Sequence, residues 1–319
     1  MHSPMTPSIS VISTNYNNGP FIADMVRSVQ AQSLEDWQLI IVDDGSTDNS
    51  RDVILELSSA EPRIVPVFLE ENAGAALAFN RGISQIKAPV VGRLDSDDAL
   101  EPEALKTLVH AHEEAPDCAM ICSHAWECDH ALQPLRLWPG YRSPEPEVSL
   151  IVECTMGAFA TFKTSKLHQT GGMDNRLRRA VDLDLYLKLE ELGNVAFIDT
   201  PLYLYRQHRG GISQGANGIA AYQWSRFVRL NAVSRRQRSR KGTLLNAQDT
   251  RSLAYSWLVT ELNGGECGFT KLEIFKFAVK HSWVLAIYPK VYFQLLRPCL
   301  LYTSPSPRDL STSRMPSSA

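Results

Sequence analysis

The sequence has few cysteines for its length, and its first residues do not have the pattern expected of a secretory leader. Its 319 residues include only six cysteines, which is too few for a disulfide-based scaffold. The first residues, Met-His-Ser-Pro-Met-Thr-Pro-Ser, lack the basic segment and the apolar run of a signal peptide. These absences favour a reducing compartment, and we expect a cytoplasmic protein.

Long apolar runs and a strong net charge are missing as well. The best candidate for a membrane span, Trp283–Leu301, is interrupted by Pro289, Lys290, Gln294 and Arg297, and it falls short of the roughly 20 apolar residues that a spanning helix needs. The formal net charge of -3 gives no general attraction to nucleic acid or anionic lipid. We therefore expect no transmembrane helix and no nucleic-acid partner.

The N-terminal half alternates strand-like with helix-like segments. Short apolar runs predict strands at residues 9–13, 39–42, 64–69 and 89–94. Helical periodicity follows each of them, with Pro20 and Pro102 suited to the first turns of two of the helices. This order predicts an α/β fold of the Rossmann-like type, in which helices cover both faces of a mostly parallel sheet.

The second half is less regular. It predicts a strand through Ile121, an apolar segment over 158–162, a helix from Val181 to Leu192, and a strand pair at Val195–Ile198 and Leu202–Tyr205. Beyond Gly218 the chain becomes helical and basic, and its last residues are rich in Ser and Pro. We expect a main domain over 8–215, a helical C-terminal region over 216–301, and a disordered or non-native tail over 302–319.

Polar loops follow three of the predicted strands. They are Thr14–Asn18, Asp43–Asp48 and Asp95–Asp98. Ligands of such sheets bind at the carboxyl ends of the strands, so the three loops are expected to meet at one rim. Paired carboxylates such as Asp95 and Asp97 suit a hard divalent cation, Mg²⁺ or Mn²⁺.

Each acidic loop also has a purely structural interpretation. Asp95–Asp98 is an acidic turn that could cap the helix at Pro102, and Ser46 or Thr47 could cap the helix after Asp43–Asp48. A lone Asp-x-Asp motif does not decide between the interpretations. The combination of motifs is more specific.

That combination resembles the family 2 inverting glycosyltransferases of the GT-A fold. The similar segments, in order, are Ser13–Asn17, Val42–Asp48, Asn72–Gly74, Asn80–Gly82, Leu94–Asp98, Gly171–Asp174, Asp182–Leu185 and Tyr205–His208. The resemblance spans roughly residues 8 to 215. It implies transfer of a sugar from a nucleoside diphosphate, UDP above all, to an acceptor hydroxyl, with inverted configuration and with Mn²⁺ or Mg²⁺ as cofactor.

The resemblance also implies roles for single residues. Thr14, Tyr16 and Asp44 would contact the base, Asp95 the ribose or a metal-bound water, and Asp97 the metal on the diphosphate. His208 is a further candidate metal ligand, although an exposed loop histidine is the plain alternative. The other candidate nucleotide-sugar contacts are Asn15, Asn72 and Arg81.

Asp182 is the expected general base. A sugar hydroxyl is a poor nucleophile, so a carboxylate that removes its proton accelerates attack. The family usually has Glu-Asp here, whereas this chain has Val181-Asp182 with Asp184 two residues further on. Asp184 therefore stays an alternative base, and both acids also suit the first turn of a helix.

Two other classes of function stay open. A nucleotidyltransferase would carry a glycine-rich, basic loop after the first strand, which Thr14–Gly19 lacks. A sugar-nucleotide-binding protein without catalysis is the other class. The expected partners are a nucleoside diphosphate sugar and a saccharide or lipid-linked acceptor, in the synthesis of envelope polysaccharide or glycolipid. The basic run Arg226–Lys241 would suit peripheral contact with the inner face of the membrane.

Overall fold

The computed structural model describes residues 6–144, 148–157, 159–208 and 217–238. The chain divides into two compact units, Met1–Leu245 and Asn246–Ala319, and every described residue belongs to the first. The predictions for the 302–319 tail and for Trp283–Leu301 lie outside the described residues. In the described part of the chain, no helix is long and apolar enough to cross a membrane.

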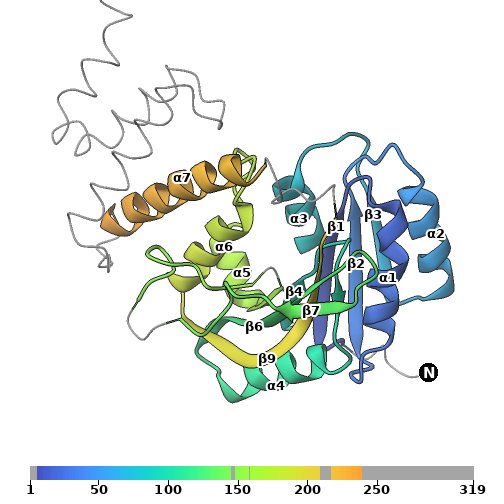
Figure 1. The fold of residues 1–319 in the computed structure, drawn as a ribbon, viewed down its shortest axis with the longest axis horizontal. Coiled ribbons are helices and arrows are strands. Elements are labelled where there is room, and N and C mark those ends of the chain that lie inside the picture. The colour runs from blue at the N-terminus through green and yellow to red at the C-terminus, as the bar shows by residue number, and fades with distance from the viewer. Residues whose placement is uncertain (1–5, 145–147, 158, 209–216, 239–319) are drawn as a thin grey trace, which may run out of the picture. The chain divides into compact units, whose positions relative to one another are not determined.

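One sheet of nine strands organises the first unit (Figure 1). Its order is β3-β2-β1-β4-β8-β6-β9-β5, and β7 pairs with β6 off this path. The strands are β1 (Ile9–Asn15), β2 (Trp37–Asp43), β3 (Ile64–Phe68), β4 (Val90–Arg93), β5 (Ala99–Leu100), β6 (Cys118–Cys128), β7 (Pro134–Leu137), β8 (Ala160–Lys163) and β9 (Asn194–Arg206). The first four are parallel, and β8 is antiparallel to both β4 and β6. The α/β class expected from the sequence is confirmed.

Helices cover both faces of this sheet. They are α1 (Gly19–Gln30), α2 (Ser50–Ala60), α3 (Ala75–Ile83), α4 (Ala104–Glu114), α5 (Thr164–Thr170), α6 (Val181–Glu190) and α7 (Asn217–Arg238). Figure 1 shows α1 and α2 together on one side of the parallel strands and α3 on the other. The apolar face of α1, formed by Ile22, Met25, Val26 and Val29, is fully buried, as its spacing requires.

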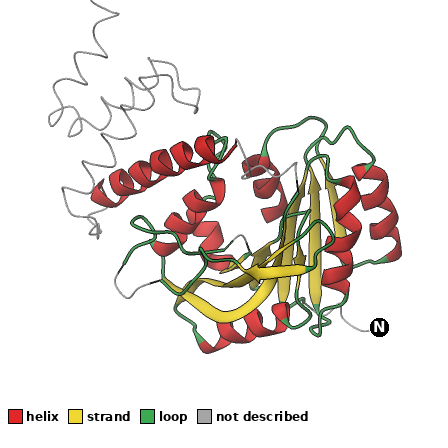
Figure 2. Ribbon diagram, viewed as in Figure 1, coloured by secondary structure: helices red, strands yellow, loops and turns green. Residues whose placement is uncertain are grey.

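The predicted strand pair at 195–198 and 202–205 is wrong. These residues form one strand, β9, which runs parallel to β6 along its whole length and whose curve is visible in Figure 2. Pro201 has no amide hydrogen and reads from sequence as a break between strands. In the structure Pro201 lies opposite His124, where the register between β6 and β9 shifts. This irregularity lets the strand continue through the proline.

Helix α7 packs against α6 through its arginines. Arg235 pairs with Glu191 at 2.8 Å and Arg236 with Glu190 at 2.6 Å. The Arg229 guanidinium donates to the carbonyl oxygens of Leu150, Ile151 and Val152. At least three of the basic side chains that suited a membrane surface are therefore engaged within the unit.

Candidate active site

The order of the parallel strands marks one position on the sheet edge. The chain runs from β1 outward through β2 to β3, and then returns to place β4 on the other side of β1. The carboxyl ends of β1 and β4 are thus the point where the strand order reverses, which is the usual ligand position in open α/β sheets. The loops Thr14–Asn18 and Asp95–Asp98 begin there, and a hydrogen bond of 3.0 Å from Asn18 to Ser96 joins them.

Of the residues in the loop Asp43–Asp48, Asp48 caps the helix that follows, because its carboxylate accepts the amide of Ser50, the first residue of α2, at 3.0 Å. Helix α4 begins at Ala104 after Glu103, whose side chain makes no cap bond. The Ser46 hydroxyl oxygen instead accepts from the amide of Asn17 at 2.9 Å. The capping roles expected of Ser46 and Thr47 are therefore wrong, and so is that of Asp95–Asp98, because β5 and Glu103 separate this loop from α4.

Asp97 and His208 form a close pair at this rim. His208 Nε2 lies 2.8 Å from Asp97 Oδ2, and the Asp97 side chain stays 22% exposed whereas that of His208 is 8% exposed. Strand β9 carries His208 to this place because its last residues run beside the loop after β4. Two atoms this close can be adjacent ligands of one ion, and the carboxylate oxygen suits Mg²⁺ or Mn²⁺.

The donor set fits a metal that a diphosphate helps to hold. Within the described ranges no cluster of three or more His, Cys, Asp or Glu side chains could bind an ion by itself. Mg²⁺ in phosphate-transferring sites is usually held by one or two carboxylates together with substrate phosphates, so two protein ligands are sufficient. The sequence-predicted ligands Asp97 and His208 meet this requirement.

Asp95 lies among charges of both signs. Arg93 Nη2 is 2.5 Å from Asp95 Oδ1, which lies two residues further along the chain. Burial raises the pKa of Asp95 to about 6; Arg93 opposes the shift, and the negative charges of Asp97 and Asp182 add to it. The three acids identified from sequence are therefore close enough to influence one another.

Asp182 and Asp184 occupy different surroundings although both lie in the first turn of α6. Asp184 is buried, with Lys188 Nζ at 2.6 Å and Arg235 Nη1 at 3.7 Å. Asp182 is half-buried, accepts the Leu183 amide at 2.8 Å, and faces the charge of Arg93. The residue before this helix turn, Ala180, has the left-handed φ of 54°, which is uncommon for a residue with a side chain.

Asp44 is buried and holds the loop after β3. Its two carboxylate oxygens accept the amides of Ala73 and Gly74, each at 2.8 Å. Gly74 has φ of 92°, a conformation that favours glycine. The backbone of Ala73 and Gly74 therefore lies against the Asp44 carboxylate, and each carboxylate oxygen keeps a second lone pair.

The other predicted nucleotide contacts differ in their placement. Asn15 is buried and donates to Asp43 at 2.9 Å, while its own Oδ1 is buried without a hydrogen-bond partner in the described chain. Thr14 is half-buried and Tyr16 is 44% exposed at the same loop. Asn72 and Arg81 are exposed, and no hydrogen bond or ion pair joins them to the acids within the described ranges.

Sequence reasoning overlooked Arg93 and Asp98. Asp98 is buried, where it accepts the Tyr203 hydroxyl and, at 2.8 Å, the amide of Arg206. Burial, followed by the charges of Asp97 and Asp95, raises the pKa of Asp98 well above its usual range. For Arg93 a signal was available, since a charged residue directly before Leu94 interrupts an otherwise apolar strand.

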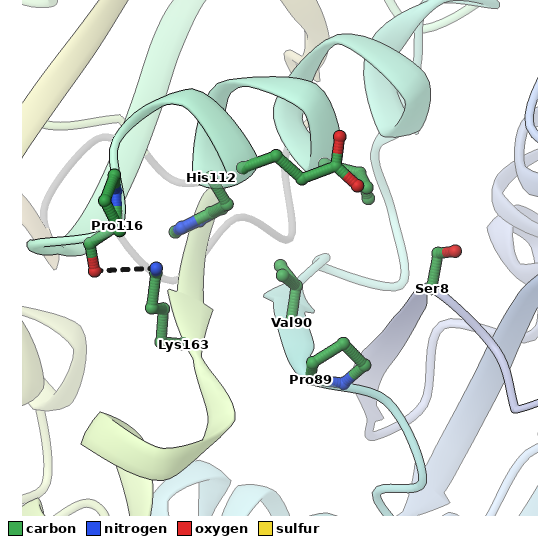
Figure 3. Close-up of a pocket in the computed structure, with 8 residues that line it drawn as sticks. Ser8, Pro89, Val90, His112, Pro116 and Lys163 are labelled. Atoms are coloured by element: carbon green, nitrogen blue, oxygen red, sulfur yellow. Dashed lines mark hydrogen bonds between the residues drawn. The ribbon is translucent and has the colours of Figure 1, made fainter.

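A hollow lies at the opposite edge of the sheet (Figure 3). It encloses about 300 Å³ between Pro116 and Lys163 on one side and Pro89, Val90 and Ser8 on the other, with His112 between them. The Thr161 hydroxyl donates to Ile121, so the His112 ring must donate through Nε2 to Thr161. Its Nδ1 is buried without a hydrogen-bond partner in the described chain.

Comparison with known proteins defines the class. Similar folds include TarS from S. aureus, residues 1–349 solved with UDP-GlcNAc (TM-score 0.59, 18% identity, 92% of this chain and 86% of that one). A mannosyltransferase from Pyrobaculum calidifontis, PcManGT, solved with GDP-Man and Mn²⁺, aligns with a TM-score of 0.50 and 17% identity over 94% of this chain and 89% of that one. The fold is GT-A, as the sequence resemblance implied.

The chain belongs to glycosyl transferase family 2, whose model matches residues 10–169. Among similar proteins is a chondroitin synthase of Pasteurella multocida (strain Pm70), 30% identical over 238 residues, which are 74% of this chain. The aligned part is 24% of that protein, so the chain spans about a quarter of the length of this relative.

Proposed function

We propose that this chain is an inverting, metal-dependent glycosyltransferase that moves a sugar from a UDP-sugar to an acceptor hydroxyl. The single observation that carries the proposal is the grouping of Asp95, Asp97, Asp182 and His208 at the carboxyl ends of β1 and β4. Family membership supports sugar transfer. The UDP and Mn²⁺ in the names of the similar structures favour this donor and this ion.

The donor's nucleotide is proposed to bind along the loop that follows β1. Tyr16 offers an exposed ring to a base, and stacking on an aromatic face is a common way to hold one. Asp44 keeps lone pairs for a base N–H after accepting two amides. The metal between Asp97, His208 and the diphosphate would stabilise the charge that grows on the departing nucleotide.

Asp182 is proposed as the base because its surroundings leave it able to act. The Asp182 carboxylate is half-buried and lies near the charge of Arg93, whereas Asp184 is buried and already paired with Lys188 and Arg235. Asp182 would take the proton of the acceptor hydroxyl as its oxygen attacks the anomeric carbon. Attack from the face opposite the nucleotide gives inversion.

The acceptor is proposed to be a growing saccharide, in polysaccharide synthesis. The name of the chondroitin synthase supports this choice, but the chain matches only part of that protein. A lipid-linked acceptor, membrane contact and a cytoplasmic location stay predictions. So do the boundaries 8–215 and 216–301.

Release of nucleotide from a panel of UDP-, GDP- and dTDP-sugars, with and without Mn²⁺, tests the proposal. The variants are Asp97→Ala and Asp182→Asn, with Asp199→Asn as control because its side chain is 91% exposed and lies on β9. We expect Mn²⁺-dependent release of UDP, lost in both site variants and kept in the control. Folded protein that binds none of the donors would refute the proposal, and tight binding without turnover on any saccharide acceptor would favour a silent binder.

A further inference from the structure

The two proposed metal ligands come from distant parts of the chain, and one buried side chain connects those parts. Asp97 follows β4, and His208 follows β9, 111 residues later. Arg206, two residues before His208, reaches back to the Asp97 loop with its Nε donating to the Asp97 carbonyl at 2.6 Å. Its own amide donates to Asp98 at 2.8 Å, so the loop is held at two successive residues.

Arg206 is also fixed from the opposite side. Its side chain is only 2% exposed, and its Nη2 lies 2.9 Å from Asp24 Oδ2 on α1. Its Nη1 donates to the His130 carbonyl in the turn between β6 and β7. The planar guanidinium fork therefore fastens three separate segments to the loop that carries Asp97, a task for which a lysine has neither the shape nor the number of donors.

Phe21 on α1 completes the arrangement. The Arg206 guanidinium carbon lies 4.8 Å from the centre of the Phe21 ring, and the His208 ring lies 4.8 Å away at an angle of 52°. One aromatic side chain thus touches both the arginine that holds Asp97 and the imidazole that faces Asp97. Replacing a side chain that orients a metal ligand from behind typically lowers metal affinity about 10- to 100-fold.

We infer that Arg206 and Phe21 are positioning residues that set the separation of Asp97 and His208 and thereby the affinity for the divalent cation. This inference rests on the proposed function, since it assigns the pair to a metal. Both residues act through the ligand pair: Arg206 holds the Asp97 loop, and Phe21 packs against the His208 ring. They fix the ligand pair before the donor arrives, so that little ordering is needed when the metal–nucleotide complex binds.

The test is the dissociation constant of Mn²⁺, measured on the full chain with saturating UDP by electron paramagnetic resonance, with thermal melting as the check on folding. Arg206→Lys is expected to weaken Mn²⁺ binding about 10- to 100-fold, the usual effect of losing an outer partner. Phe21→Leu should weaken it about 2- to 5-fold through loss of the ring contacts, and Phe21→Tyr, which keeps the ring, should bind as the wild type does.

A matched control separates positioning from general destabilisation. Arg236 is similarly buried, with bonds to Ser149 at 2.9 Å and Glu190 at 2.6 Å, but it lies on α7. Arg236→Lys should lower the melting temperature and leave Mn²⁺ affinity unchanged. Wild-type affinity in folded Arg206→Lys and Phe21→Leu would overturn the inference alone, and if Arg206→Lys does not fold, the Phe21 variants decide. A wild type that binds no Mn²⁺ with UDP would overturn the proposed function as well.

Discussion

The two edges of the parallel strands use polar groups in opposite ways. At the carboxyl edge, Asp95, Asp97 and Asp182 are kept close together although their charges repel. At the amino edge, His112 is buried as a neutral ring, because burial and the charge of Lys163 lower its pKa to about 4. Repulsion between carboxylates, which a cation would relieve, marks the first edge, and a buried, uncharged histidine marks the second.

The comparison also shows that concavity alone does not locate the chemistry of this protein. The hollow beside His112 and a second one beside Trp37 and Arg63 both lie at the amino edge. The acids lie instead where the strand order reverses. Charge crowding and backbone conformation, such as that of Ala180, point to the functional edge more directly than shape does.

The largest expected effect is a loss of catalytic rate on substitution at the carboxyl edge. Asp182→Asn should lower kcat by about 10²- to 10⁴-fold because the acceptor hydroxyl loses its base, with little change in donor affinity. Steady-state kinetics with Mn²⁺ and UDP-sugar measure this effect.

Asp184→Asn is the matched variant, two residues away on the same helix. It leaves Lys188 and Arg235 partly unpaired, so it should destabilise the fold by about 3 kcal/mol and keep kcat per folded molecule. The reverse pattern, with kcat lost only in Asp184→Asn, would exchange the two assignments.

At the amino edge we expect a pH effect on stability instead. The pKa of His112 is about 4 in the folded protein against 6.5 unfolded, so below pH 6.5 the unfolded chain takes up a proton that the folded chain does not. The stabilisation is complete above pH 6.5 and falls by about 3 kcal/mol as the pH drops to 4. Urea unfolding between pH 4 and 7 measures the loss, which His112→Gln should reduce. If the free energy of unfolding falls as steeply with pH in His112→Gln as in the wild type, other groups cause the loss of stability.

A smaller pH effect should appear in ligand binding at the carboxyl edge. Asp95 has a pKa of about 6 in the metal-free protein, and binding of the metal–nucleotide complex needs its ionised form. Affinity for Mn²⁺ and UDP should therefore fall about tenfold for each pH unit below 6. Calorimetry from pH 5 to 8 tests this, and a flat profile over that range would show that Asp95 does not ionise on binding.

The smallest effect concerns the turn held by Asp44. Gly74→Ala places a side chain at φ of 92°, which costs roughly 1–2 kcal/mol for an L-residue. Displacement of the Gly74 amide from Asp44 should also raise the KM for the UDP-sugar while kcat stays constant. An unchanged KM would separate this turn from nucleotide binding.

Much of the fold follows from the sequence because apolar runs and strand-end loops alternate regularly up to β4. The long strand β9 was not predictable in the same way, since Pro201 reads as a break unless the register shift against β6 is known. The grouping of Asp97 with His208 came only through family resemblance. The role of Arg206 depends on contacts across distant segments, which no local pattern encodes, whereas Arg93 stands out as a charge in an apolar strand.

The central claim is that the carboxyl edge holds a metal–nucleotide complex through Asp97 and His208. A crystal structure of the full chain with Mn²⁺ and UDP, with anomalous scattering recorded at the manganese edge, tests it directly. The prediction is one strong peak within bonding distance of both side chains, beside the diphosphate. A peak elsewhere, or UDP bound with no manganese at this pair, would contradict the claim.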